Sequence, residues 1–313
     1  MNVVQDSACN CELTKTPLCE PSGHAMEKKA AENYVIKFET TQGDFEVEVR
    51  RAWAPNGADR VFNLVRLGFF TNTAFYRTIH RPACNKDWVV QFGVSSDPRV
   101  SCIYNANDGS VPAPGAIIPD DPVYPGLSNT AGVLSFSAVL DQERGGFACN
   151  RTTELYISYK NNSMLDKFGF APVGKVMKDG MQVVRKLYAG YGEMEDACDL
   201  HGYTPCKGPL TSKLYAEGLS YLKQDFPKLD YIKQATILKS VRPGGGDNLL
   251  LMIVVLGVAF TILGVLRWIH SGDRLNICCP RVEQRPDEAA EYNEISVALV
   301  ESQHKANGPG DNI

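Results

Sequence analysis

The feature that most constrains this chain is an uncharged apolar run near its C-terminus. Residues 249–266 read LLLMIVVLGVAFTILGVL and contain no charged side chain. As a helix, this run would span roughly 27 Å at 1.5 Å per residue, close to the thickness of a hydrocarbon core. Arg267 and Trp268 follow, and such residues are typical of a membrane–water interface. The run predicts one transmembrane helix over 248–269, with the lipid bilayer as a partner; a buried core helix is the alternative.

The apolar run divides the chain into five predicted segments. They are a cysteine-containing leader (1–32), a folded domain (33–241, with an insertion at 194–211), a glycine-rich linker (242–247), the membrane helix and an acidic tail (270–313). The tail carries eight acidic and four basic residues, a composition that predicts disorder. Cys278 and Cys279 lie shortly after the span and are candidate palmitoylation sites.

Composition and charge exclude several classes of protein. The chain is 44% hydrophobic and 22% charged, which are ordinary values for a globular protein. Its formal net charge is −4, and the residues before 270 are neutral overall. Nucleic-acid-binding proteins usually carry a basic stripe, so no nucleic-acid partner is expected.

Residues 33–241 have the pattern of a mainly β domain. Apolar and charged residues alternate over 45–49, as in a half-buried strand, and residues 34–38 are also strand-like. Further short apolar runs lie at 75–79, 88–92, 133–136, 155–158 and 173–176. Helices are predicted at 55–68, which begins with a proline, and at 181–187. Many short strands with few helices predict a closed barrel or a sandwich.

Short motifs follow one another along this domain in a recognisable order. They are 41–45 (TQGDF), 61–65 (VFNLV), 75–79 (FYRTI), 88–93 (WVVQFG), 132–137 (GVLSFS), 153–157 (TELYI) and 169–176 (GFAPVGKV). In this order they resemble the signature segments of the cyclophilin-type peptidyl-prolyl isomerases. The resemblance implies a closed eight-stranded antiparallel barrel capped by two α-helices, with an active groove on one outer face. It implies proline-containing peptides or client proteins as partners, and neither cofactor nor metal.

The reaction implied by the resemblance is rotation about an X–Pro peptide bond. Its barrier is about 18–20 kcal/mol, because the C–N bond has partial double-bond character. An arginine can lower this barrier by donating to the prolyl nitrogen, whose lone pair becomes available only as conjugation is lost. Arg77 matches the family's catalytic arginine, and Gln91 matches the groove glutamine that hydrogen-bonds the substrate backbone. The resemblance also assigns substrate-binding positions to Trp88, Val89, Ser137, Ala138, Tyr156 and Leu165.

Three further groove positions depart from the family pattern. Glu154 replaces a glutamine, and its carboxylate could compete with substrate for the Arg77 guanidinium or could orient it. Met164 replaces the groove tryptophan, which lowers the expected affinity for cyclosporin, and Phe170 stands where many members have histidine. Glu154 and Met164 favour the alternative function, a non-catalytic module that binds proline peptides and is tethered to a membrane. Arg77 and Gln91 favour the enzyme.

The cysteines bear on the compartment of the domain. Eight precede the apolar run, an even number that suits up to four disulfides, and Cys198 and Cys206 would close a short loop in the insertion. Leader cysteines at 9, 11 and 19 lack the usual zinc spacing, so disulfides or a free leader are expected there. The first thirty residues contain no apolar run typical of a signal peptide. We expect a lumenal or extracellular domain, with a cytosolic domain as the alternative.

Overall fold

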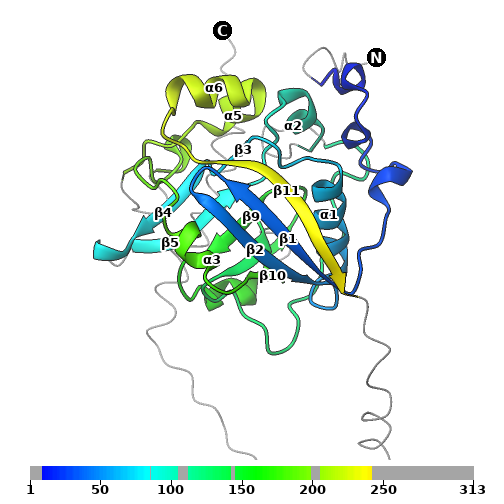
Figure 1. The fold of residues 1–313 in the computed structure, drawn as a ribbon, viewed down its shortest axis with the longest axis horizontal. Helices are drawn as coiled ribbons and strands as arrows, with labels where there is room; N and C mark the ends of the chain where they lie inside the picture. Colours follow the sequence, from blue (N-terminus) through cyan, green and yellow to red (C-terminus); the bar gives the residue numbers. More distant parts are fainter. Residues whose placement is uncertain (1–8, 85, 105–111, 142–144, 199–204, 242–313) are drawn as a thin grey trace, which may run out of the picture.

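The structure is a computed structural model that describes residues 9–84, 86–104, 112–141, 145–198 and 205–241 (Figure 1). The predicted linker, membrane helix and tail lie outside these residues, as do the candidate palmitoylation sites Cys278 and Cys279. Within the described part of the chain, no helix combines the length and apolar character that a membrane span requires.

Most strands belong to one curled antiparallel sheet of nine strands (Figure 1). In spatial order they are β3 (Thr73–Ala74), β11 (Tyr231–Val241), β1 (Asn33–Thr40), β2 (Gly43–Arg50), β10 (Pro172–Val176), β6 (Val133–Phe136), β9 (Leu155–Ser158), β5 (Lys86–Phe92) and β4 (Arg77–Arg81). Two further strands, β7 (Val139–Asp141) and β8 (Phe147–Cys149), form a separate hairpin. The fold is therefore mainly β, as the sequence predicts.

The sheet has nine strands and is not closed, so the prediction of a closed eight-stranded barrel is wrong. Its two edge strands, β3 and β4, are consecutive in the chain and are separated only by Phe75 and Tyr76. The N–H of Phe75 donates to the carbonyl of Asp230, beside β11, whereas Arg77 is already paired with Gln91 in β5. The segment predicted as one strand over 75–79 thus crosses from one edge of the sheet to the other. The chain spans the gap that a hydrogen-bonded ladder would otherwise close.

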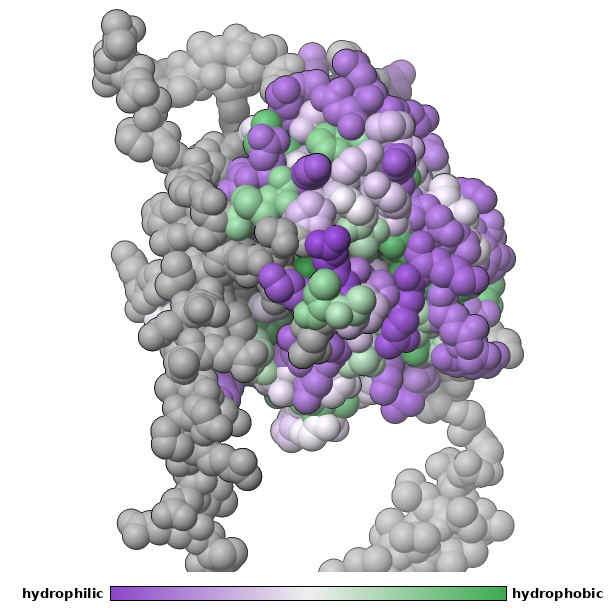
Figure 2. Space-filling view, turned by 90° about the vertical axis from the view of Figure 1, so that its left-hand side faces the viewer, coloured by the Kyte–Doolittle hydropathy of each residue, from purple (hydrophilic) through white to green (hydrophobic). Residues whose placement is uncertain are grey.

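The main core lies inside the curled sheet because apolar residues alternate along its strands. Tyr34, Ile36 and Phe38 of β1 are completely buried, and the residues between them are partly exposed. The ring of Phe38 stacks on that of Phe45 in β2, with centroids 5.2 Å apart. On the face drawn in Figure 2, hydrophilic residues predominate and hydrophobic ones form small separate areas. Burial of alternate side chains therefore accounts for the two strands expected at 34–38 and 45–49.

The described residues contain five α-helices, so the prediction of a two-helix cap is incomplete. The two expected helices are α1 (Pro55–Arg66), which packs against β11, β10 and β2, and α3 (Gly180–Val184). Three others were not expected: α2 (Pro98–Tyr104), α5 (Thr211–Glu217) and α6 (Leu219–Asp225). Helices α5 and α6 each bury part of their surface: α5 buries Leu214 and Tyr215, and α6 buries Tyr221 and Leu222.

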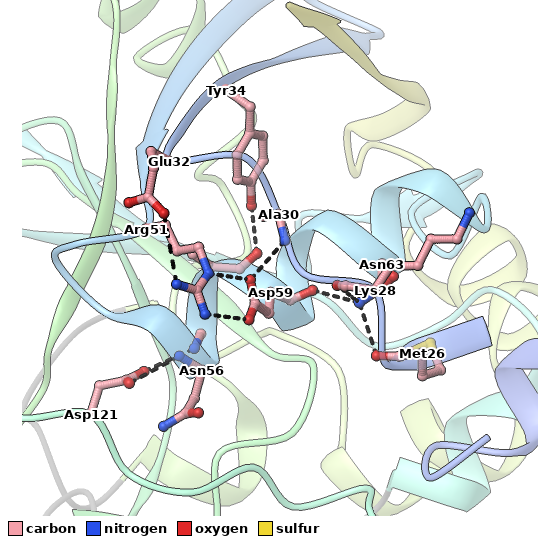
Figure 3. A network of polar contacts seen from close by, with 12 residues as sticks. Met26, Lys28, Ala30, Glu32, Tyr34, Arg51, Asn56, Asp59, Asn63 and Asp121 are labelled. Carbon is pink, nitrogen blue, oxygen red and sulfur yellow. Dashed lines mark hydrogen bonds and ion pairs between the residues drawn. The ribbon is translucent and has the colours of Figure 1, made fainter. Parts of the chain in front are cut away.

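The described part of the leader, residues 9–32, packs on the domain and is held there by covalent and polar contacts. Cys11 pairs with Cys19, and Cys9 pairs with Cys102 of α2. The leader thus contains disulfides, which were one of the two alternatives expected for it. Asn63 of α1 is completely buried, and its Nδ2 donates to two leader carbonyls at 2.9 and 2.8 Å (Figure 3).

A second apolar cluster packs beside β4, apart from the main core. Its buried members include Tyr76, Val94, Met194, Leu214, Tyr215, Tyr221, Leu222 and Phe226. Many of them come from residues 191–229, where Cys198 and Cys206 form a disulfide, the pair that the short loop suggests. Met194 and Ala197 belong to this cluster, so it brings the segment that contains Glu193 against the side of β4 on which Arg77 lies.

Candidate active site

A pocket opens on the outer side of β4, β5 and β9, and its empty space, which is in part open to solvent, amounts to about 280 Å³. Eight residues line it, and all eight are among those singled out from the sequence: Arg77, Trp88, Val89, Gln91, Ser137, Tyr156, Leu165 and Phe170. Ala138 and Met164 pack in the apolar cluster beneath the pocket, Ala138 buried and Met164 partly so. Glu154 lies next to the pocket through its contact with Gln91. The structure therefore brings the predicted groove residues together.

Aromatic and aliphatic side chains form the floor of the pocket. Trp88, Tyr156 and Phe170 are each at most 5% exposed, and the rings of Tyr156 and Phe170 meet edge to face at 6.2 Å. The Tyr156 hydroxyl donates to Asn129 Oδ1 at 2.9 Å, and burial raises its pKa far above the ordinary value. Because its hydroxyl is neutral and turned onto a buried partner, Tyr156 presents an apolar ring. Such a slot suits a small apolar group.

Arg77 stands at the wall of this slot and is held by two side chains. It begins β4, opposite Gln91 of β5, and is 8% exposed. Its Nη1 donates to Gln91 Oε1 at 3.0 Å. Its Nε and Nη2 donate to the two carboxylate oxygens of Glu193 at 2.6 and 2.8 Å. The bidentate carboxylate partner of Arg77 is therefore Glu193, a residue that the sequence analysis does not single out.

Glu154, expected to act on the Arg77 guanidinium, is a partner of Gln91 and two tyrosines. Gln91 Nε2 donates to Glu154 Oε2 at 2.8 Å and to Ser137 Oγ at 3.1 Å. Tyr76 donates its hydroxyl to the same carboxylate, and so does Tyr215 of α5. Burial, and then the charge of Glu154, raise the pKa of Tyr76, which keeps this hydroxyl protonated as a donor. These contacts fix the Gln91 amide with its oxygen toward Arg77.

Sequence reasoning missed three contributors to the site: Glu193, Tyr76 and Tyr215. Tyr76 precedes Arg77 in a signature motif, and this position was a signal that it could contribute. Glu193 and Tyr215 lie beside or beyond the insertion, where no motif marks them. In the described ranges, no group of three or more His, Cys, Asp or Glu side chains could hold a metal ion. The arrangement offers a fixed guanidinium, a fixed amide and an apolar slot.

Comparison with known proteins finds a matching family model and a curated relative. The family model for "Cyclophilin type peptidyl-prolyl cis-trans isomerase/CLD" matches residues 35–199. A peptidyl-prolyl cis-trans isomerase of Acinetobacter baylyi is 25% identical over 172 residues, which cover 53% of this chain and 77% of that protein.

Solved structures of a Cryptosporidium parvum cyclophilin-type peptidyl-prolyl cis-trans isomerase are also similar. One has a TM-score of 0.44 and another, determined in the presence of the dipeptide Ala-Pro, has a TM-score of 0.43. Both are 18% identical to this chain. Each alignment covers 66% of this chain, and it covers 98% of the first solved chain and 99% of the second. The family model spans more than half of the chain, and this protein belongs to the cyclophilin-type peptidyl-prolyl cis-trans isomerases.

Proposed function

We propose that the pocket accelerates rotation about X–Pro bonds of peptides and client proteins, with Arg77 stabilising the twisted amide. The observation that carries this proposal is the position of the Arg77 guanidinium, held at the wall of an apolar slot. In the planar amide the prolyl nitrogen shares its lone pair with the carbonyl and accepts no hydrogen bond. The lone pair becomes an acceptor as the bond twists, so a donor at this point favours the transition state over the ground state.

The other residues hold the substrate while the bond turns. The proline ring enters the slot formed by Trp88, Tyr156 and Phe170, and burial of its apolar surface supplies binding energy. Gln91 hydrogen-bonds the peptide backbone next to the proline. No proton is transferred and no covalent intermediate forms, because only a torsion angle changes. One end of the peptide is held and the other rotates.

Cis–trans exchange of a Pro-containing tetrapeptide, measured by NMR with the full chain in a detergent micelle, tests this function. We expect catalytic amounts of the protein to accelerate an exchange that otherwise takes tens to hundreds of seconds. The same peptide with alanine in place of proline should neither bind nor exchange. Shifted peptide resonances without faster exchange would instead support the alternative, a tethered proline-binding module, which Glu154 and Met164 favour as departures from the family pattern.

We also propose that residues 248–269 anchor the domain to a membrane and that the domain is lumenal or extracellular. The uncharged run of residues 249–266 supports the anchor. The three disulfides of the described residues support an oxidising compartment, because such bonds are rare in the cytosol. In this orientation Cys278 and Cys279 would face the cytoplasm, where palmitoylation occurs.

Sealed vesicles from cells that express the chain test this topology. Asn150 and Asn161 are both exposed and both begin an Asn-x-Ser/Thr sequence. We expect a glycosidase to shift the electrophoretic mobility of the protein, and the double replacement Asn150→Gln with Asn161→Gln to abolish that shift. Added protease should leave the domain intact until detergent opens the vesicles. Digestion in intact vesicles would place the domain in the cytosol, and release of the chain by alkaline carbonate would refute the anchor.

A further inference from the structure

Glu193 holds Arg77 from a distant part of the chain. The two residues are 116 positions apart, and the Glu193 side chain is completely buried. Its two oxygens accept from Nε and Nη2 of the same guanidinium. Two parallel N–H···O bonds fix the plane of a guanidinium as well as its position. Glu193 therefore determines which edge of Arg77 can turn toward the pocket.

The backbone around Glu193 is itself held in place. Its N–H donates to the carbonyl of Pro205 at 2.9 Å, and its carbonyl accepts from the N–H of Gly208 at 2.8 Å. Its carboxylate also accepts from the N–H of Met194 at 2.8 Å. Gly192 permits this close approach, because it has a φ of +70° and a Cβ there would lie 2.1 Å from the Pro205 carbonyl oxygen. These hydrogen bonds hold the backbone and the carboxylate of Glu193 in a fixed position.

Gln91 contacts the guanidinium at its other edge and extends the same chain of contacts. Its Oε1 accepts from Arg77, and its Nε2 donates to Glu154, which also accepts from Tyr215. Turning the Gln91 amide over would place its –NH₂ group against the guanidinium, where no acceptor would be available. Arg77 therefore donates to Glu193 and to Gln91, and Gln91 donates to Glu154. Only one orientation of the Gln91 amide satisfies all of these contacts.

We propose that Glu193 is a positioning residue for isomerisation, an inference that rests on the function proposed for Arg77. An unrestrained arginine side chain populates many rotamers, and ordering it in the transition state would raise the barrier. Glu193 orders the guanidinium before substrate binds, so that the donor already points where the prolyl lone pair develops. Because Arg77 acts on the twisted amide and not on the planar one, positioning raises kcat and leaves KM nearly unchanged.

Glu193→Gln in the full chain is the main test. The variant keeps the size of the side chain but places an –NH₂ group against the guanidinium. We expect kcat for an X–Pro tetrapeptide to fall about tenfold or more, with KM within about twofold of the wild-type value. Glu195→Gln is the matched control, because it makes the same chemical change at an exposed position two residues away. The control should retain both constants.

Two further variants separate this role from the proposed function. Arg77→Ala should be slow, and Arg77→Ala combined with Glu193→Gln should be no slower, because Glu193 acts only through Arg77. A wild-type kcat in Glu193→Gln beside a slow Arg77→Ala would overturn the positioning role and leave the proposed function intact. Equal activity of Arg77→Ala and wild type would overturn the proposed function itself.

A spectroscopic signature distinguishes positioning from general support of the fold. The Nε–H resonance of Arg77 should be shifted and should exchange slowly with water in the wild type, and both properties should be lost in Glu193→Gln. Glu193→Asp covers the case in which the Gln variant does not fold, since it retains the charge but withdraws the carboxylate by one methylene. We expect Glu193→Asp to have an altered Arg77 resonance and a reduced kcat. An altered resonance with a wild-type kcat would overturn the proposal.

Discussion

Replacing Arg77 with alanine is expected to lower kcat/KM for X–Pro isomerisation by about 10²–10³-fold, the usual loss when one preorganised donor to a transition state is removed. The guanidinium lies at the wall of the pocket, 8% exposed, so the proposed interaction with a twisted amide would be shielded from water. The apolar slot remains in the variant, and peptide binding should change little. The loss should therefore fall on kcat, measured by NMR exchange or by a protease-coupled assay.

Three variants control for other effects of the replacement. Arg81→Ala removes the same side chain from an exposed position in the same strand and should leave kcat/KM unchanged. Arg77→Lys retains a positive charge but cannot offer two parallel donors to Glu193, so it should remain well below the wild type. Since Arg77→Ala leaves Glu193 buried without its counter-ion, urea unfolding must be measured alongside, and Arg77→Ala with Glu193→Gln relieves that cost. Wild-type turnover in a folded Arg77→Ala protein would refute the assigned role.

Local patterns in the sequence predicted many of the strands, although not β3, β7, β8 or β11, and the signature motifs selected the residues of the groove. The alternation over 45–49 marks β2 because burial of one face of a strand has a period of two residues. Arg77 and Gln91 could be selected because both lie in short signature motifs, and their strands pair directly, so that the two side chains meet. Residues that contribute to the site from one strand, or from two strands that are consecutive in the chain and pair with each other, can therefore be selected from local motifs.

Contacts between distant segments could not be read from the sequence in the same way. Glu193 meets Arg77 across 116 positions, and nothing in the local pattern around Glu193 distinguishes a buried ion-pair partner from an exposed acidic residue. The disulfide from Cys9 to Cys102 spans 93 positions and could not be read from the sequence, whereas Cys198 and Cys206 lie only 8 positions apart and their short loop suggested the pair. Closure of the sheet depends on where Phe75 directs its N–H, a choice that a periodicity of apolar residues does not encode.

Asp121, a residue that stabilises the fold, also acts through contacts with distant segments that the sequence does not reveal. Helix α1 begins after Ala54, whose side chain cannot cap the first turn. Asp121 supplies the cap from a distant loop, because its carboxylate accepts from the N–H groups of Asn56 at 3.0 Å and Gly57 at 2.8 Å (Figure 3). The same carboxylate accepts from Nη1 of Arg151 at 3.1 Å, and both side chains of this ion pair are at most 3% exposed.

Asp121→Ala is expected to lower the free energy of unfolding by about 3–5 kcal/mol, because removal of one partner leaves the other charge buried without compensation. Loss of the helix cap contributes to this figure about 1 kcal/mol. The matched control is Asp120→Ala, which removes the neighbouring carboxylate. Asp120 lies 3.5 Å from Arg151 but is 34% exposed, so we expect a loss of at most about 1 kcal/mol. Urea unfolding followed by circular dichroism gives both values.

A double replacement decides whether the uncompensated charge or the lost cap dominates. Asp121→Asn retains an oxygen that can accept from the first turn of α1, but it leaves the Arg151 guanidinium without a carboxylate at Nη1. Adding Arg151→Met removes that buried charge and fills similar volume, so the double variant should be more stable than Asp121→Asn alone by at least about 1 kcal/mol. If the buried charge contributes nothing, the second replacement will only add its own loss of contacts, including the guanidinium 5.7 Å above the Phe136 ring. A double variant less stable than the single one would therefore assign the role of Asp121 to the helix cap.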